Sequence, residues 1–236
     1  MTSSPSPTRE PAWGDVLVWF ETIDAIVRGL GHSLNNRALA LSATIESLDA
    51  KRPVGAEISA SLIGESARLT EHLRQLRALP FAAAGEPMPL LLPDVLSVAL
   101  HLHRSHASLG DVSAYLEGTA ETPPVLASES SLVHAALVTL TAMKGFAAPG
   151  GVVRVSYAGT PEQATVTFRA ERDPSDERNG SGDQGLITPT SLAAALLGGA
   201  RVEIEQRIGV EVTSVMWLMP SLRTMRRLAR EMAAAG

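Results

Sequence analysis

Residues 13–48, WGDVLVWFETIDAIVRGLGHSLNNRALALSATIESL, carry the pattern that decides the fold. Apolar side chains recur along this stretch in alternating steps of four and three residues, with two positions of the repeat skipped. Such a repeat is typical of one long helix with a single apolar seam. The proline and glycine of the following stretch, DAKRPVG at 49–55, predict its end. The seam consists of Val16, Phe20, Ile23, Val27, Leu30, Leu34, Leu41 and Leu48.

A second amphipathic helix is predicted from about residue 56 to residue 79. Two long helices joined by a short turn form an antiparallel hairpin. One hairpin cannot cover both of its apolar seams, whereas two hairpins from two chains cover them as a four-helix bundle. We therefore expect a homodimer with twofold symmetry. The seam of the second helix is Ile58, Leu62, Leu69, Leu73 and Leu76.

The rest of the chain predicts a second domain after a linker. The segment 80–93 contains four prolines and one glycine, which predicts that linker, and residues 1–12 are expected to be a disordered tail. Residues 94–236 alternate between helical and strand-like patterns, which predicts an α+β arrangement of helices on a mixed sheet. The expected helices are 94–107, 128–147, 188–197 and 221–235, the expected strands are 112–117, 152–157, 163–170, 201–206 and 211–219, and a polar loop is expected at 171–185.

Composition narrows the class of protein. Hydrophobic residues make up 45% of the 236-residue chain and charged residues 19%, as in globular proteins with a buried core. The net charge of -5 disfavours nucleic acid as a partner. The chain has no cysteine, which excludes disulfides and fits a reducing cytoplasm, and no apolar run is long enough to cross a membrane. We expect a cytoplasmic protein.

His32 is the candidate nucleophile. On the seam of the first helix, Val27, Leu30 and Leu34 point inward, which puts His32 at the most outward position of the repeat and Asn36 one turn further on the same side. A solvent-exposed imidazole is largely neutral and nucleophilic at physiological pH. Such a side chain is suited to accept a phosphoryl group by in-line displacement.

The stretch His32–Leu39, HSLNNRAL, resembles the H-box of sensor histidine kinases, which commonly reads His-Glu-Leu-Asn-Asn-Pro-Leu. Its place on the first of two hairpin helices also matches that family. The later segments resemble the family's ATP-binding domain in order and spacing, so the resemblance implies a kinase-type ATPase α/β sandwich after the hairpin. The segments that carry this second resemblance are Pro123–Ser128, Leu132–Ala147, Gly150–Val155 and Leu192–Glu203.

Several departures from the family concern ATP. Thr139 and Met143 stand where the family has asparagines that hold Mg²⁺ and phosphates, and a thioether is a poor ligand for a hard cation. Lys144 stands where a small residue is usual, and no glycine pair follows the strand that ends near Ala170. Ser33 replaces the usual carboxylate beside the histidine. The chain is therefore similar to dimeric histidine phosphotransferases that descend from kinases and keep a degenerate ATPase-like domain.

The resemblance implies a phosphorelay. A receiver-domain aspartate of an upstream hybrid kinase would pass its phosphoryl group to His32, and a downstream response regulator would take it. Mg²⁺ would belong to the receiver, so no cofactor or metal of this chain's own is expected. Asn36 is a second candidate catalytic residue, since that position assists dephosphorylation in related kinases. The receiver would dock on Arg28, Asn35 and Arg37 beside the histidine.

Other interpretations stay open at this stage. The chain is alternatively a pseudokinase adaptor that binds and inhibits a regulator or kinase without transfer, or a divergent ATP-dependent histidine kinase. His101, His103 and His106 resemble a metal cluster, but a helix points His101 and His103 to different sides and no carboxylate or cysteine completes a site. His72 is a weak candidate for the flank of the docking surface. The glycines at 180–185 predict a flexible loop, and the arginines of the last helix a solvated face.

Overall fold

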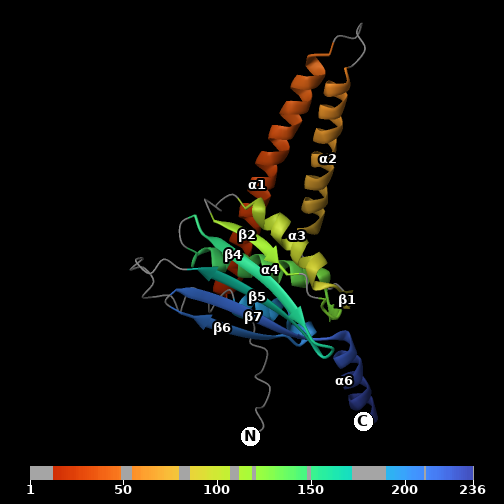
Figure 1. Cartoon of the computed structure of the whole chain (residues 1–236), viewed down its shortest axis with the longest axis vertical. Helices are drawn as coiled ribbons and strands as arrows, with labels where there is room; N and C mark the ends of the chain where they lie inside the picture. The colour runs from red at the N-terminus through yellow and green to blue at the C-terminus, as the bar shows by residue number, and fades with distance from the viewer. Residues whose placement is uncertain are drawn as a thin grey trace.

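The computed structural model describes residues 13–48, 55–79, 86–106, 112–118, 121–147, 150–171, 190–209 and 211–235. The chain begins with two long helices that run side by side in opposite directions (Figure 1). Helix α1 spans Trp13–Glu46 and helix α2 spans Ala56–Ala78, so both end within two residues of the predicted bounds. The predicted tail, 1–12, lies outside the described residues. Within the described residues, no helix has the length and apolarity needed to span a membrane.

A five-stranded mixed sheet forms the centre of the second half. Its strand order is β2-β4-β5-β7-β6. Strands β2 and β4 are parallel, and every other neighbouring pair is antiparallel. Each predicted strand is present, with ends shifted by at most two residues. The strands are β2 (Ser113–Glu117), β4 (Val152–Gly159), β5 (Gln163–Glu171), β6 (Glu203–Ile208) and β7 (Val212–Pro220).

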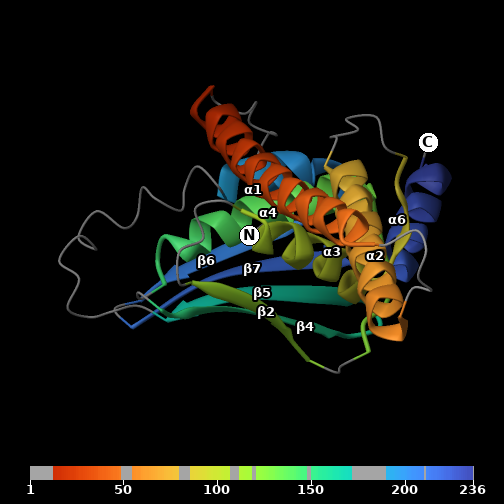
Figure 2. The ribbon, with the colours of Figure 1, turned by 90° about the horizontal axis from the view of Figure 1, so that it is seen from above.

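Helices cover one face of this sheet (Figure 2). Helix α3 spans Leu92–Arg104 and helix α4 spans Glu129–Lys144, and α4 packs on β4, β5 and β7. Ser128 caps α4 as predicted, because its side chain accepts a hydrogen bond from the backbone N–H of Ser131. Residues 190–196 are helical and lead into a 3₁₀ turn at Gly198–Ala200.

The predicted linker is shorter than expected at its C-terminal end. Residues 88–90 form strand β1 (Met88–Leu90), which pairs antiparallel with β3 (Val125–Ala127), and α3 starts at Leu92. The physical reason is that prolines are tolerated in an edge strand and in the first turn of a helix, where their missing N–H is not needed. The last helix, α6 (Leu222–Ala235), projects from the sheet domain at the end opposite the distal ends of α1 and α2 (Figure 1).

The base of the hairpin shares its core with the sheet domain. Thr22, Ile26 and Leu30 recur every fourth residue of α1 and are at most 2% exposed, and the two apolar ones belong to the same buried cluster as α3, α4 and the sheet. Beside them, the Trp19 indole N–H donates to Nδ1 of His134 on α4 over 3.0 Å. The first half of α1 is therefore anchored to the sheet domain through one continuous stripe.

This stripe differs from the predicted seam. Only Leu30 belongs to both, while the seam residues Val16, Phe20 and Val27 are 39%, 64% and 44% exposed in the single chain. The predicted seam is therefore a different stripe of α1 from the one that the sheet domain buries in the single chain. The reason is that α1 carries two adjacent apolar stripes, and the sheet domain covers one of them. A repeat of four and three cannot tell the two apart because they share a helix face.

Candidate functional site

His32 lies near the middle of α1, and its side chain is exposed. Leu30 is fully buried two residues earlier, whereas Asn35 and Asn36 are exposed on the following turn. Because a helix turns by about 100° per residue, His32 lies about 200° away from the buried Leu30. The imidazole therefore faces away from the part of α1 that is anchored in the core.

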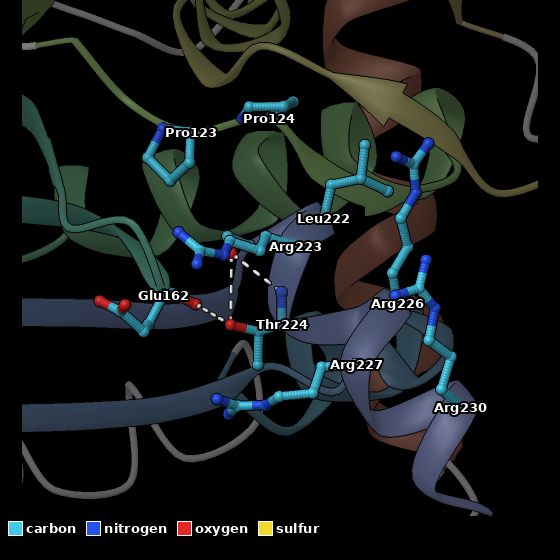
Figure 3. A pocket seen from close by; sticks show the side chains of 10 residues that line it. Pro123, Pro124, Glu162, Leu222, Arg223, Thr224, Arg226, Arg227 and Arg230 are labelled. Atoms are coloured by element: carbon cyan, nitrogen blue, oxygen red, sulfur yellow. Dashed lines mark hydrogen bonds between the residues drawn. The ribbon is translucent and has the colours of Figure 1, made fainter.

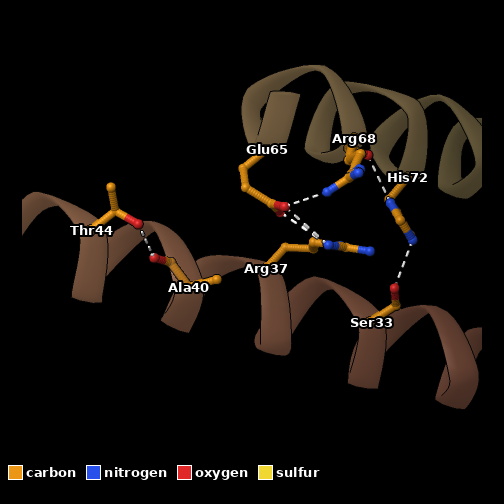
Figure 4. A network of polar contacts seen from close by, with 7 residues as sticks. All are labelled: Ser33, Arg37, Ala40, Thr44, Glu65, Arg68 and His72. Carbon is orange, nitrogen blue, oxygen red and sulfur yellow. Dashed lines mark hydrogen bonds and ion pairs between the residues drawn. The ribbon is translucent and has the colours of Figure 1, made fainter. Parts of the chain in front are cut away.

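The residue after His32 joins the two helices of the hairpin. The Oγ atom of Ser33 lies 2.7 Å from Nε2 of His72 on α2, and Nδ1 of the same ring lies 2.7 Å from the carbonyl oxygen of Arg68 (Figure 4). A carbonyl oxygen only accepts, so Nδ1 carries the proton and Nε2 accepts from the Ser33 hydroxyl. This chain of donors fixes both the tautomer of His72 and the rotamer of Ser33.

A second polar link lies one turn further along the hairpin. Nη1 of Arg37 lies 3.1 and 3.2 Å from the two carboxylate oxygens of Glu65 on α2, and Arg68 binds Oε1 of the same carboxylate at 2.5 Å (Figure 4). Partial desolvation raises the pKa of Glu65, but hydrogen bonds from Arg68 and Arg37 outweigh it and hold the pKa below its ordinary value. The carboxylate therefore stays charged between the two guanidinium groups.

These links brace the hairpin beside His32. Ser33 and Arg37 are four residues apart, so both face α2 from neighbouring turns of α1. The crossing of the helices at this level is set by directional polar contacts, whereas the anchored base is set by apolar packing. Arg28 lies on the exposed side and pairs with Asp24 within α1. Of the residues predicted to dock a receiver, Arg28 and Asn35 are exposed and Arg37 is half-buried by its contact with Glu65; the catalytic candidate Asn36 is also exposed.

Thr139 and Met143, the positions that correspond to the nucleotide-binding asparagines of histidine kinases in the sequence comparison, point into the protein. Thr139 is 2% exposed, and its hydroxyl donates to the carbonyl oxygen of Ala135 over 2.8 Å. Met143 is fully buried in the core. Residues 172–189, which contain most of the predicted loop and its glycines, lie outside the described residues.

His101 and His103 of α3 and His106 after its end do not form a ligand group. His101 is exposed and bonds to the carbonyl oxygen of Ser97, whereas His103 is 1% exposed and its Nε2 has no hydrogen-bond partner among the described residues. No group of three potential metal ligands occurs in the described part of the chain. Burial, with smaller contributions from the nearby charges of His106 and Lys144, lowers the pKa of His103 to about 3. His103 is thus a neutral core side chain.

Sequence reasoning missed the brace. It treated Ser33 as a lost carboxylate and His72 as a weak flank of a docking surface, and it did not consider Glu65. The partners are 39 and 28 residues apart in sequence, on opposite sides of a turn whose length does not fix the pairing. The sequence signal that could have indicated these contacts is that Ser33, His72 and Glu65 are polar although they face the other helix of the hairpin.

No protein-family model matches the sequence, and no curated protein matches it. Among solved structures, histidine kinase AdeS of Acinetobacter baumannii is 10% identical, with a TM-score of 0.46, over 81% of this chain and 98% of that one. A histidine kinase of Burkholderia phymatum is 14% identical, with a TM-score of 0.46, over 81% and 97%. Histidine kinase ThkA in complex with the response regulator TrrA is 9% identical, with a TM-score of 0.44, over 81% and 59%. At this level of similarity, function has to be argued from the chain's own residues.

The Ser33–His72 contact predicts a measurable coupling. In a double-mutant cycle with Ser33→Ala and His72→Ala, we expect a coupling free energy of about 0.5–1.5 kcal/mol, typical of one hydrogen bond. Urea unfolding of the four proteins measures it. Ser42→Ala, an exposed serine of the same helix, is the matched control and should couple to His72→Ala by nothing measurable. A coupling of zero for Ser33 would contradict the brace.

His103 predicts a loss of stability in acid. Its folded-state pKa is lowered, so the unfolded chain binds a proton that the folded chain excludes. The stabilisation is complete above the ordinary histidine pKa of 6.5 and falls as the pH drops from there towards about 3. Unfolding midpoints in urea between pH 7 and pH 4 should decline less steeply for His103→Gln than for the unmodified chain. His101→Gln, at an exposed site, should follow the unmodified chain; equal slopes for all three would refute the assignment.

Proposed function

We propose that this protein is a phosphorelay histidine phosphotransferase of two-component signal transduction, with His32 as the phosphoacceptor. The observation that carries the proposal is the exposed imidazole beside a hairpin crossing that Ser33–His72 and Arg37–Glu65 hold in place. Such an arrangement presents a nucleophile to a partner while limiting its motion. Phosphoryl transfer depends mainly on positioning and on charge neutralisation, which a partner can supply.

The proposed step moves a phosphoryl group from oxygen to nitrogen. A ring nitrogen of neutral His32 attacks the phosphorus of a receiver's phospho-aspartate, the P–O bond to the carboxylate breaks, and a P–N bond forms. The aspartate leaves as a carboxylate, and the proton on the other ring nitrogen stays in place. The reverse geometry returns the group to the aspartate of a second receiver. Mg²⁺ bound by the receiver would neutralise the phosphoryl oxygens, so the chain's own side chains act as nucleophile and docking groups.

The exposed side chains around His32 suit an acidic partner surface. Arg28 lies one turn before the histidine, with its side chain 63% exposed, and Asn35 and Asn36 supply neutral donors and acceptors on the next turn. Arg37 is held by Glu65, so a docking phosphate would have to compete for it. We therefore assign steering to Arg28, surface contacts to the two asparagines, and bracing to Arg37.

Two features favour the transferase over an ATP-dependent kinase. The Ser33 hydroxyl stands where a carboxylate base is usual in the family and is already engaged with His72. On α4, Thr139 and Met143 are turned into the core, where neither reaches a Mg²⁺ ion or a phosphate. The exposure of His32 favours transfer over a purely adaptor role, because binding alone does not require a free imidazole.

A transfer assay tests the proposal. With receivers from the same genome phosphorylated with labelled phosphate, we expect label to move to this chain and on to a second receiver. His32→Ala should reduce the label on the chain to background, while His101→Ala, at another exposed helical histidine, should leave transfer unchanged.

Two outcomes would contradict this assignment. Labelling from ATP alone would assign the chain to the kinases. A stable complex with a phosphorylated receiver, without movement of label, would assign it to the adaptors. In both cases the circular dichroism spectrum of His32→Ala serves as the control that the hairpin remains folded.

We also propose that the chain is a homodimer through the hairpin. Phe20 and Val27 are one heptad apart on α1 and are 64% and 44% exposed, and Ile63 and Leu73 are exposed on α2. Apolar side chains on both helices of an uncovered hairpin fit a twofold four-helix bundle with a second copy.

Light scattering should give twice the 24.8 kDa mass of one chain. Combined Phe20→Asp and Val27→Asp substitutions should shift the mass to that of a monomer, because they place charges in the buried seam. Met232→Asp, at an equally exposed apolar side chain on α6, is the matched control and should remain dimeric. A monomeric unmodified chain would refute the dimer.

A further inference from the structure

An arginine-lined groove lies at the start of α6, away from the hairpin. Its volume is about 530 Å³. The loop residues Pro123 and Pro124 and the β4–β5 turn residue Glu162 form one wall, and the first two turns of α6 form the other (Figure 3). Four arginines of α6 line it: Arg223, Arg226, Arg227 and Arg230.

The charge of this surface is opposite to that of the chain. Helix α6 carries four arginines and one glutamate, a net charge of +3, whereas the whole chain carries -5, which leaves -8 for the remaining residues. The arginines occupy positions i, i+3, i+4 and i+7, so they form one broad stripe along the helix that consists of two neighbouring rows, Arg223 with Arg227 and Arg226 with Arg230. Met225 and Leu228 lie on the opposite side and are half-buried, so the body of the protein covers part of the apolar face and the arginine stripe faces outward.

Most of these guanidinium groups are not engaged. Among the described residues, Arg223, Arg226 and Arg230 have no ion-pair partner, and Arg227 has only an exposed pair with Glu231 at 3.7 Å. Two N–H groups of the first turn are already engaged, because the Leu222 N–H donates to the carbonyl oxygen of Pro124 and the Thr224 N–H donates to Oγ of Ser221. Recognition of an anion therefore falls to the arginine side chains.

From this geometry we propose that the groove binds an extended acidic segment of a partner protein, with Asp or Glu at alternate positions. Arg223 and Arg227 extend to one side of α6, and Arg226 and Arg230 to the other (Figure 3). The members of each pair are about 6 Å apart along the helix axis. Alternate side chains of an extended segment are about 6.7 Å apart. One carboxylate can therefore meet each arginine of a row, and the proline rings offer apolar contact to the residues between.

Other anionic partners fit the surface less well. An anionic membrane would require the apolar face of α6 to enter the lipid, but Met225 and Leu228 of that face are already half-buried. A nucleic acid would extend beyond the groove over the acidic remainder of the chain, which would repel it, whereas a short acidic segment can stay within the arginine stripe. The site lies at the opposite end of the molecule from the distal ends of α1 and α2, and it does not depend on the proposed role of His32 (Figure 1).

Fluorescence anisotropy with the full chain tests the inference. The probe is a labelled 12-residue peptide of alternating glutamate and alanine, and the control peptide has glutamine in place of glutamate. We expect the acidic peptide to bind, with an affinity that falls as salt is added. Arg226→Glu with Arg230→Glu, and separately Arg223→Glu with Arg227→Glu, should each weaken binding by about tenfold or more. Arg207→Glu, at an exposed arginine of β6 outside the groove, should bind as the unmodified chain does.

Three results would overturn the inference. They are equal binding of the glutamine peptide, unchanged binding by both double variants, and loss of binding in His32→Ala, which would move the site to the hairpin. Binding to phosphatidylserine vesicles is measured as the test of the membrane alternative. If the vesicles bind through these arginines while the acidic peptide does not, the surface belongs to a membrane. Circular dichroism of each variant confirms that α6 remains folded.

Discussion

The structure depends on the burial of one stripe of α1 against the sheet domain. Thr22, Ile26 and Leu30 are taken into the core that α3, α4 and the sheet build, and Trp19 adds a hydrogen bond to His134 at its edge. Burying an Ile or a Leu side chain contributes about 1.5–3 kcal/mol each, which is enough to hold a helix in one orientation. Because α1 continues unbroken past this anchor, the same helix that completes the core also sets the direction of the His32 side chain.

Beyond the anchor, polar contacts replace apolar packing. Around His32 the two helices of the hairpin meet through a hydroxyl, an imidazole, a carboxylate and two guanidinium groups. Apolar contacts tolerate small rotations, whereas hydrogen bonds require particular distances and angles. The proposed phosphoryl transfer needs an imidazole that is open to a partner yet fixed in orientation. The change from apolar packing to polar contacts between the helices serves this need. The apolar side chains on the outer face of the hairpin remain exposed in the single chain.

Much of the architecture could be predicted from the sequence. The features that could not be predicted were missed for identifiable physical reasons. The long helices, the five strands of the sheet and the cap at Ser128 follow from periodicity and local propensity. Strand β1 was hidden because prolines at 87 and 89 indicate a linker unless the edge pairing with β3 is known. The stripe of α1 that faces the sheet domain was not predicted, because the apolar repeat indicated a neighbouring stripe that shares only Leu30 with it. The exposure of His32 followed from its place in the repeat, but the Ser33–His72 and Arg37–Glu65 contacts depend on a hairpin register that no local pattern encodes.

The spacing of two residues between the buried Leu30 and the exposed His32 constrains how this segment can evolve. Because a helix turns by about 100° per residue, one residue added or removed before the histidine would swing it a quarter turn or more, towards α2 or towards the sheet domain. Substitutions at exposed positions of this segment leave the direction of the His32 side chain unchanged, whereas insertions and deletions do not. Lineages that share this arrangement should therefore vary at the exposed positions between residues 22 and 32, while they keep the buried positions 22, 26 and 30 and the number of residues constant.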